Sequence, residues 1–274
     1  MVGIRRFVFG AIGAAVAVAA GAALIRRVIR EQRTNAAILN ETLPVHSKWW
    51  RQQATLPGDL LYIALGDSAA QGIGATAPNR GYVGLIAERI AELTGRSVRT
   101  VNLSVSGARV EDAITVQLPK LRGYAPDVVT LSIGANDVVA FEPTRFEEAL
   151  RTIFEALPPH AIVADLPYFY LPRNERTVAR ANAIVHKVAA EFGLTTAPLY
   201  ATTRGAGLRG ALTLFANDMF HPNDRGYRLW ADAFRPALQN LLLPNATPTA
   251  THAATSSDPP PAGPPRNPTP GSTR

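Results

Sequence analysis

The sequence predicts an α/β fold built on a parallel sheet of five strands. Between residues 58 and 243, short runs rich in β-branched and aliphatic residues alternate with longer amphipathic stretches. Such alternation favours parallel strands joined by right-handed helical crossovers, with helices on both faces of the sheet. Of the 274 residues, 47% are hydrophobic, which is ample for one large core.

The predicted elements follow one another in regular order. Strand-like composition marks residues 61–65, 98–103, 127–133, 161–166 and, more weakly, 194–199. Apolar residues recur close to the helical period in residues 82–93, 110–121, 144–157 and 174–192, and a last helix is expected over residues 224–242. The sequence shows no internal repeat, so these elements are expected to form one domain over residues 58–243.

The N-terminus carries an apolar segment of membrane-spanning length. Residues 7–25 are 19 uncharged, mostly apolar residues, about the length that crosses the hydrocarbon of a bilayer as a helix. Small residues within this segment also offer sites for a signal peptidase, so residues 1–30 are predicted to be an uncut anchor or a signal segment. Arginines flank the segment on both sides, which gives only a weak orientation. We expect an anchored or exported protein whose domain lies outside the cytoplasm.

Three other segments fall outside the predicted elements. Residues 31–57 are expected to be a linker whose Trp49 and Trp50 can pack on the domain. The Gly-rich residues 202–213 are expected to form a mobile loop. Residues 244–274 hold nine prolines and almost no bulky apolar side chains. This tail cannot bury enough surface to offset its ordering entropy, so it is predicted to be disordered.

The distribution of charge excludes some classes of function. The net charge is +7, but residues 34–243 hold 20 basic and 19 acidic residues, so most of the excess lies near the N-terminus. No basic stripe interleaved with aromatic residues is present, which argues against a nucleic-acid partner. The chain has no cysteine, which excludes disulfides, thiolate nucleophiles and cysteine-based metal sites.

Small and polar residues follow three successive predicted strands. The sequence Gly-Asp-Ser (66–68) follows the first strand, residues 102–108 end the second, and Gly-Ala-Asn-Asp (134–137) follows the third. The carboxyl ends of parallel strands share one edge of a sheet, which is where ligands bind in such folds. Residues 217–223 precede the last helix and are expected to return to this edge.

This edge supports nucleophilic catalysis. Ser68 is a candidate nucleophile in a strand-to-helix turn, and His221 is a candidate base. Asp218 lies three residues before His221, a spacing that allows its carboxylate to orient the imidazole. The backbone N–H groups of Ser68 and Gly107 and the side-chain amide of Asn136 are candidate donors to an oxyanion.

Other polar and aromatic residues are expected to have structural roles. Asp67 and Asp137 are expected to be local hydrogen-bond supports rather than acids. His160 and His186 are expected to be structural or solvated. The aromatic run over residues 168–172 follows the fourth strand, where it could line an acyl or aglycone pocket or pack against an edge.

The four motifs together resemble those of the SGNH (GDSL-type) hydrolases. Residues 66–72 are similar to the first block with its nucleophilic serine, and Gly107 is similar to the glycine of the second. Residues 134–137 match the third block through Asn136, and residues 218–221 match the final Asp-x-x-His block. The resemblance implies a flavodoxin-like three-layer α/β/α sandwich, no metal or organic cofactor, and ester hydrolysis or acyl transfer through an acyl-enzyme. The first block departs from the Gly-Asp-Ser-Leu spelling at a position without a chemical role.

The function predicted from these residues is that of a serine esterase. Its substrate is expected to be an ester of an acylated lipid, a sugar or a small alcohol near the cell envelope. Three alternatives remain open: an acyltransferase that uses the same triad, a thioesterase or lysophospholipase, and a non-enzymatic envelope-binding protein. The membrane is an expected partner through the N-terminal segment, and the sequence does not indicate an oligomeric state.

Overall fold

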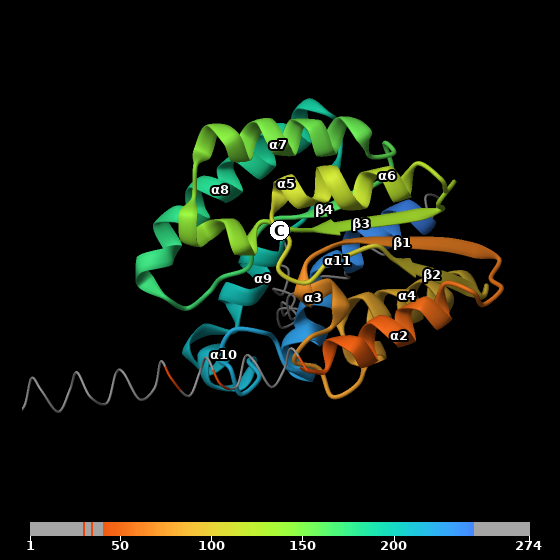
Figure 1. Cartoon of the computed structure of the whole chain (residues 1–274), viewed down its shortest axis with the longest axis horizontal. Helices are drawn as coiled ribbons and strands as arrows, with labels where there is room; N and C mark the ends of the chain where they lie inside the picture. The colour runs from red at the N-terminus through yellow and green to blue at the C-terminus, as the bar shows by residue number, and fades with distance from the viewer. Residues whose placement is uncertain (1–29, 31–33, 35–40, 244–274) are drawn as a thin grey trace, which may run out of the picture. The chain divides into compact units, whose positions relative to one another are not determined.

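A parallel five-stranded sheet lies at the centre of the computed structural model, which describes residues 30, 34 and 41–243 (Figure 1). The strand order is β2-β1-β3-β4-β5, and every neighbouring pair is parallel. The strands are β1 (Leu60–Gly66), β2 (Val98–Asn102), β3 (Val128–Ser132), β4 (Ile162–Ala164) and β5 (Thr195–Ala197). The predicted α/β fold is therefore confirmed.

The central strands are apolar because helices cover both of their faces. Every residue of β3 is buried, and in β1 only Leu61 is partly exposed. Alternate residues of these strands face two separate hydrophobic clusters, so Ile63 and Leu65 lie in one while Tyr62 and Ala64 lie in the other. Continuous burial of this kind is typical of parallel strands within a three-layer fold.

Two sets of helices form the outer layers. On one face lie α5 (Val110–Asp112), a π-helical turn η2 (Ala113–Gln117), α6 (Leu118–Leu121), α7 (Pro143–Ala156) and α8 (Pro172–Glu191). The other face is covered by α2 (Leu43–Gln53), α4 (Tyr82–Thr94) and α11 (Asp224–Leu242) (Figure 1). Shorter elements complete the chain: α3 (Ser68–Gln71), η1 (Pro78–Arg80), η3 (Ala135–Ala140), α9 (Leu199–Gly205) and α10 (Gly207–Thr213).

Helix α2 lies within residues 31–57, the stretch predicted to be a linker that can pack on the domain. Its Trp50 and His46 are buried, and Trp50 belongs to the same hydrophobic cluster as α4 and α11. These tertiary contacts stabilise a helix of only eleven residues, which would be marginal in isolation.

The prediction of a loop over residues 202–213 is wrong, because α9 and α10 occupy this stretch. Glycine disfavours a helix by only about 1 kcal/mol relative to alanine, which packing easily outweighs. Gly207, with a φ of 58°, marks the break between the two helices. Gly210 packs directly against Tyr170, where a larger residue would not fit.

The two ends of the chain do not enter this description. The apolar segment over residues 7–25 and the Pro-rich tail over residues 244–274 lie outside the described residues, so both assignments stay predictions. Within the described part of the chain, no helix combines the length and the apolar character that crossing a bilayer requires.

Candidate active site

The turn after β1 presents Ser68 at the carboxyl edge of the sheet. Gly66 ends the strand with a φ of 152°, and a Cβ atom there would lie 2.4 Å from the carbonyl oxygen of Ser132. Only glycine therefore fits this position. Asp67 then caps α3 by accepting a hydrogen bond from the backbone N–H of Ala69 at 2.9 Å, and Ser68 is the first residue of the helix.

Ser68, His221 and Asp218 form a continuous hydrogen-bonded chain. His221 Nε2 lies 2.9 Å from Ser68 Oγ, and His221 Nδ1 lies 2.6 Å from Asp218 Oδ2. All three residues are buried. Because an ionised carboxylate only accepts, Nδ1 is assigned the proton, which leaves Nε2 free to accept the hydroxyl hydrogen of Ser68.

The environment of Asp218 favours its ionised form. Burial by itself raises the pKa of this carboxyl, but the hydrogen bond and the charge of His221 act in the opposite direction. Two backbone N–H groups, those of Phe220 and His221, also donate to Asp218 Oδ1 at 3.0 Å. The net result is a pKa below the ordinary value, so the carboxylate stays charged beside the imidazole.

The loop that carries His221 is fixed at both of its ends. Ala216 N–H donates to the carbonyl oxygen of His221 at 2.8 Å, which closes the loop on itself. Asn223 caps α11 by accepting from the N–H groups of Arg225 and Gly226. The Asn223 side chain also donates to the carbonyl oxygens of Thr213 and Phe215. The loop is thus held between α10 and α11, and it returns to the sheet edge as the sequence predicts.

The candidate oxyanion donors come from three neighbouring segments. Asn136 follows β3 and directs one amide hydrogen to the carbonyl oxygen of Ala108 at 3.0 Å, while Asp67 Oδ2 lies 3.4 Å from the same nitrogen. Gly107 has a φ of 78°, and no hydrogen bond within the described residues uses its backbone N–H. Ser68 and Asn136 line the cavity described below, whereas Gly107 is not part of its lining.

Asp67 and Asp137 hold backbone groups, the kind of role expected from their positions. Burial raises the pKa of each to about 6. Asp67 caps α3, and Asp137 Oδ2 accepts from the N–H of Val110 at 3.3 Å. Neither carboxylate lies in the hydrogen-bonded chain from Ser68 to Asp218.

An apolar cavity opens beside Ser68 and His221. The space it encloses is about 580 Å³ when the solvent-open mouth is included. Its wall includes the aromatic residues Tyr168, Phe169, Tyr170, Phe215, Phe220 and Trp230. The first three belong to the aromatic run after β4, which therefore lines a pocket. Thr203 holds this run, because its hydroxyl accepts from the N–H of Tyr168 at 2.8 Å and its carbonyl oxygen accepts from Tyr170 Oη at 2.5 Å.

Several polar residues that support the site were not singled out from the sequence. Gln117 is fully buried, and its side chain accepts from the N–H of Gly66 at 2.9 Å and donates to the carbonyl oxygen of Gly66 at 2.8 Å. Gln71 donates through Nε2 to Ser104. Gln117 lies on the apolar face of the helix predicted over residues 110–121. A polar residue at such a position indicates a buried side chain that forms hydrogen bonds.

The two histidines expected to be structural lie outside the cavity wall. His160 Nε2 contacts the carbonyl oxygen of Pro126 at 3.1 Å, and His186 Nε2 lies 3.2 Å from Asp165. Among the residues that the structure describes, no group of three or more His, Asp or Glu side chains is arranged to hold a metal ion.

Comparison with known sequences identifies the family. The sequence pattern of the GDSL-like lipase/acylhydrolase family matches residues 64–229, which include Ser68, Asn136, Asp218 and His221. The chain belongs to this family. A GDSL-like esterase of Mycobacterium tuberculosis is 26% identical over 208 residues, a match that covers 70% of this chain and 65% of that protein. The chain thus spans slightly less than two thirds of that relative's length.

Solved structures share the fold of this GDSL-like chain. An α/β hydrolase enzyme from the metagenome of Lake Arreo in Spain aligns with a TM-score of 0.57 at 23% identity, covering 69% of this chain and 99% of that one. An acetylxylan esterase from Geobacillus stearothermophilus aligns with a TM-score of 0.53 at 21% identity, covering 66% and 94% of the two chains. At these identities the likeness concerns the fold alone.

Proposed function

We propose that this GDSL-like chain is a serine esterase that cleaves carboxylic esters through an acyl-enzyme. The observation that carries the proposal is the hydrogen-bonded chain from Ser68 Oγ through His221 to Asp218 at 2.9 and 2.6 Å, placed at the wall of an apolar cavity. The family match and the name of the mycobacterial relative support the same class of reaction.

The first half-reaction forms an ester bond to the enzyme. Ser68 Oγ attacks the ester carbonyl carbon while His221 Nε2 takes the hydroxyl proton, and the carbonyl oxygen becomes an oxyanion. The N–H groups of Ser68 and Gly107 and the Asn136 amide are the proposed donors to that oxyanion. When the tetrahedral intermediate collapses, the bond to the alcohol oxygen breaks and His221 gives the proton to that oxygen.

The second half-reaction releases the acid. A water molecule attacks the acyl carbon, and His221 again takes a proton at Nε2. Collapse of the second intermediate breaks the bond to Ser68 Oγ, which regains its proton. Asp218 stays ionised throughout and stabilises the imidazolium form of His221.

The cavity is suited to binding esters whose acyl or alcohol part is apolar. Its wall is mainly apolar and includes six aromatic residues, of which Phe169 and Phe220 face each other with ring centroids 6.5 Å apart. The names of similar proteins span an acetylxylan esterase and a lipase from a goat rumen metagenome, so both acylated sugars and lipids belong in a substrate panel.

The test combines covalent labelling with turnover. A fluorophosphonate probe should label the full chain, and Ser68→Ala should abolish both the labelling and the hydrolysis of p-nitrophenyl esters. Ser47→Ala, a serine of α2 outside the cavity wall, is the matched control and should behave like the parent. Labelling that persists in a folded Ser68→Ala protein would overturn the proposal. Product analysis with an added sugar or lipid alcohol distinguishes hydrolysis from acyl transfer.

A further inference from the structure

Large apolar side chains are exposed beside the cavity that contains Ser68. Leu208 and Leu212 of α10 are 88% and 83% exposed, and Met219 and Phe220 of the His221 loop are 51% and 45% exposed. We refer to these four residues as the apolar rim. All four lie within residues 208–220, a stretch that also contributes Leu214 and Phe215 to the cavity wall. Exposed apolar residues that lie close together commonly mark an interaction surface.

Leu208 and Leu212 are exposed because α10 packs on the domain through its opposite side. Gly210 faces the domain, because a Cβ atom there would lie only 2.1 Å from Tyr170 Oη. Leu208 and Leu212 are four residues apart and lie on the opposite side of the helix. Asn223 holds the end of α10, since its backbone N–H donates to the carbonyl oxygen of Leu214 at 2.9 Å. The two leucines are therefore held in solvent by a fixed helix.

The apolar rim adjoins the wall of the cavity at Phe220. Phe220 is exposed and also lines the cavity, and Leu214 and Phe215, which follow α10, line it as well. Met219 adopts a φ of 55°, which is unfavourable for a side chain of its type. This backbone places an apolar side chain in solvent next to His221.

The segment that carries α9 and α10 is basic. Residues 199–217 contain Arg204 and Arg209 and no acidic residue. Both arginines are exposed, and neither forms an ion pair with a described residue. Apolar side chains flanked by exposed arginines are the combination that binds the surface of an anionic bilayer.

We propose that the apolar rim, with Arg204 and Arg209, docks the domain on an anionic lipid surface so that the cavity opens toward the acyl chains. The rim residues enter the boundary between headgroups and acyl chains, while the two arginines contact lipid phosphates. Docking of this kind does not require catalysis, so it can be tested independently of the proposed esterase activity.

The sequence before the domain is compatible with this arrangement. Seventeen residues, 26–42, separate the apolar segment over residues 7–25 from α2. A chain of this length spans at most about 60 Å when fully extended. A domain tethered by this segment would lie within reach of the lipid surface that residues 7–25 are predicted to enter.

The test places a fluorophore at the rim. Because the chain has no cysteine, Leu212→Cys in the full-length Ser68→Ala protein creates a single site for an environment-sensitive dye. Val116→Cys, an exposed apolar position on η2, is the matched control. The protein is mixed with vesicles that contain equal parts of phosphatidylglycerol and phosphatidylcholine and a lipid with a quencher on its acyl chain.

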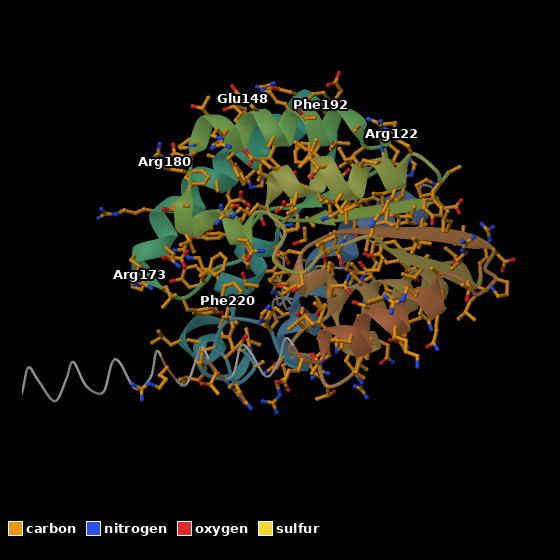
Figure 2. The ribbon with its side chains drawn as sticks, in the orientation of Figure 1. Arg122, Glu148, Arg173, Arg180, Phe192 and Phe220 are labelled. Atoms are coloured by element: carbon orange, nitrogen blue, oxygen red, sulfur yellow. The ribbon has the colours of Figure 1, made fainter. Side chains whose placement is uncertain are left out.

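The expected result is quenching at residue 212 that exceeds quenching at residue 116 by at least about threefold. Changing both arginines, Arg204→Gln and Arg209→Gln, should reduce the quenching by at least about half, whereas Arg122→Gln, at the far end of the domain from Phe220 (Figure 2), should not. Equal quenching in pure phosphatidylcholine would overturn the anionic preference. No quenching at residue 212, or a dye shift that depends on protein concentration without vesicles, would overturn docking on lipid.

Discussion

His46 Nδ1 lies 2.8 Å from the carbonyl oxygen of Gln71, the last residue of the helix that begins at Ser68. Trp50 Nε1 donates to the same oxygen at 3.1 Å. Because a carbonyl oxygen only accepts, Nδ1 of His46 carries a hydrogen. Helix α2, which precedes the segment matched by the family pattern, thus holds the far end of the helix that carries the candidate nucleophile.

The first prediction concerns the stability that His46 provides. His46→Ala removes a buried hydrogen bond and leaves a cavity, so it should lower the free energy of unfolding by about 1–3 kcal/mol. His46→Asn keeps a donor near the position of Nδ1 and should lose less. Lys48→Ala, on the exposed side of the same helix, should change the free energy by less than about 0.5 kcal/mol. Urea unfolding monitored by tryptophan fluorescence provides the measurement.

The contribution of His46 to the free energy of unfolding should also depend on pH. Burial lowers the pKa of folded His46 below the value of 6.5, an effect that the hydrogen bond to Gln71 opposes in part. The folded state then binds fewer protons than the unfolded state, so this contribution to stability is complete above pH 6.5 and is lost as the pH falls. The stability difference between the parent and His46→Asn should therefore shrink between pH 8 and pH 5.5. A constant difference would contradict this account.

The contribution of Asp67 to stability should change with pH in the direction opposite to that of His46. Burial raises its pKa from 3.8 to about 6, so the folded state binds the proton more tightly, and this contribution is lost as the pH rises through 6. Asp67→Asn keeps an oxygen that can cap α3 but does not ionise. Relative to the parent, the variant should become more stable as the pH increases from 4 to 7, by about 1.4 kcal/mol per unit of pKa shift at most.

The control for Asp67 is Asp59→Asn. Hydrogen bonds from Ser97 lower the pKa of Asp59 below 3.8, so its contribution to stability is lost only at pH values below that figure. The Asp59→Asn variant and the parent should show parallel curves between pH 4 and pH 7. Free energies from urea unfolding at several pH values distinguish the two variants, and a flat difference for Asp67→Asn would show that the carboxyl is not held in its neutral form.

The sheet and its helices were predictable because their signals are local. Each of the five predicted strands overlaps an observed strand, and the helix predicted at residues 82–93 is observed as Tyr82–Thr94. Burial between two helical layers requires continuous apolar runs in the strands, and such runs are visible in the sequence. The positions of Ser68 and Asn136 could be inferred as well, since turns that follow successive parallel strands meet at one edge of the sheet. The position of His221 could be inferred from its Asp-x-x-His spacing before the last helix.

The remaining features depend on contacts between distant residues. Gln117 contacts Gly66 across 51 positions, and His46 contacts Gln71 across 25, so no short window of sequence reveals either partner. Helices α9 and α10 contain three glycines, and their composition resembles that of a loop. Tertiary packing against Tyr170 and the His221 loop decides their structure instead.

Gly210 and Gly205 provide a matched pair in these helices. A Cβ atom at Gly210 would lie 2.1 Å from Tyr170 Oη, whereas a Cβ atom at Gly205 meets nothing within 4 Å. Gly210→Ala should displace Tyr170 from the cavity wall and cost about 1–3 kcal/mol of stability. Gly205→Ala should be neutral or stabilising by up to about 1 kcal/mol.

The two glycine variants should also differ in substrate selectivity. Since Tyr170 lines the cavity, Gly210→Ala should change KM among p-nitrophenyl esters of different acyl length, while Gly205→Ala should leave the order of KM values unchanged. Thermal melting and a series of acyl esters measure both effects. If a folded Gly210→Ala protein kept the same order of KM values, the acyl group would not bind beside Tyr170.

The last prediction separates the charge of Asp218 from its shape. In Asp218→Asn the side-chain oxygen can still accept from the N–H groups of Phe220 and His221, so the loop should keep its structure. The amide nitrogen, however, would donate to His221 Nδ1 and move the imidazole proton to Nε2, where it blocks transfer from Ser68. We expect kcat to fall by about 10⁴-fold with little change in melting temperature, and fluorophosphonate labelling of Ser68 to slow in parallel. Asn136→Ala, which removes one oxyanion donor but leaves the imidazole unchanged, should lower kcat by only about 10²–10³-fold. A folded Asp218→Asn protein that retained a large part of the parent kcat would show that Asp218 does not orient His221 for catalysis.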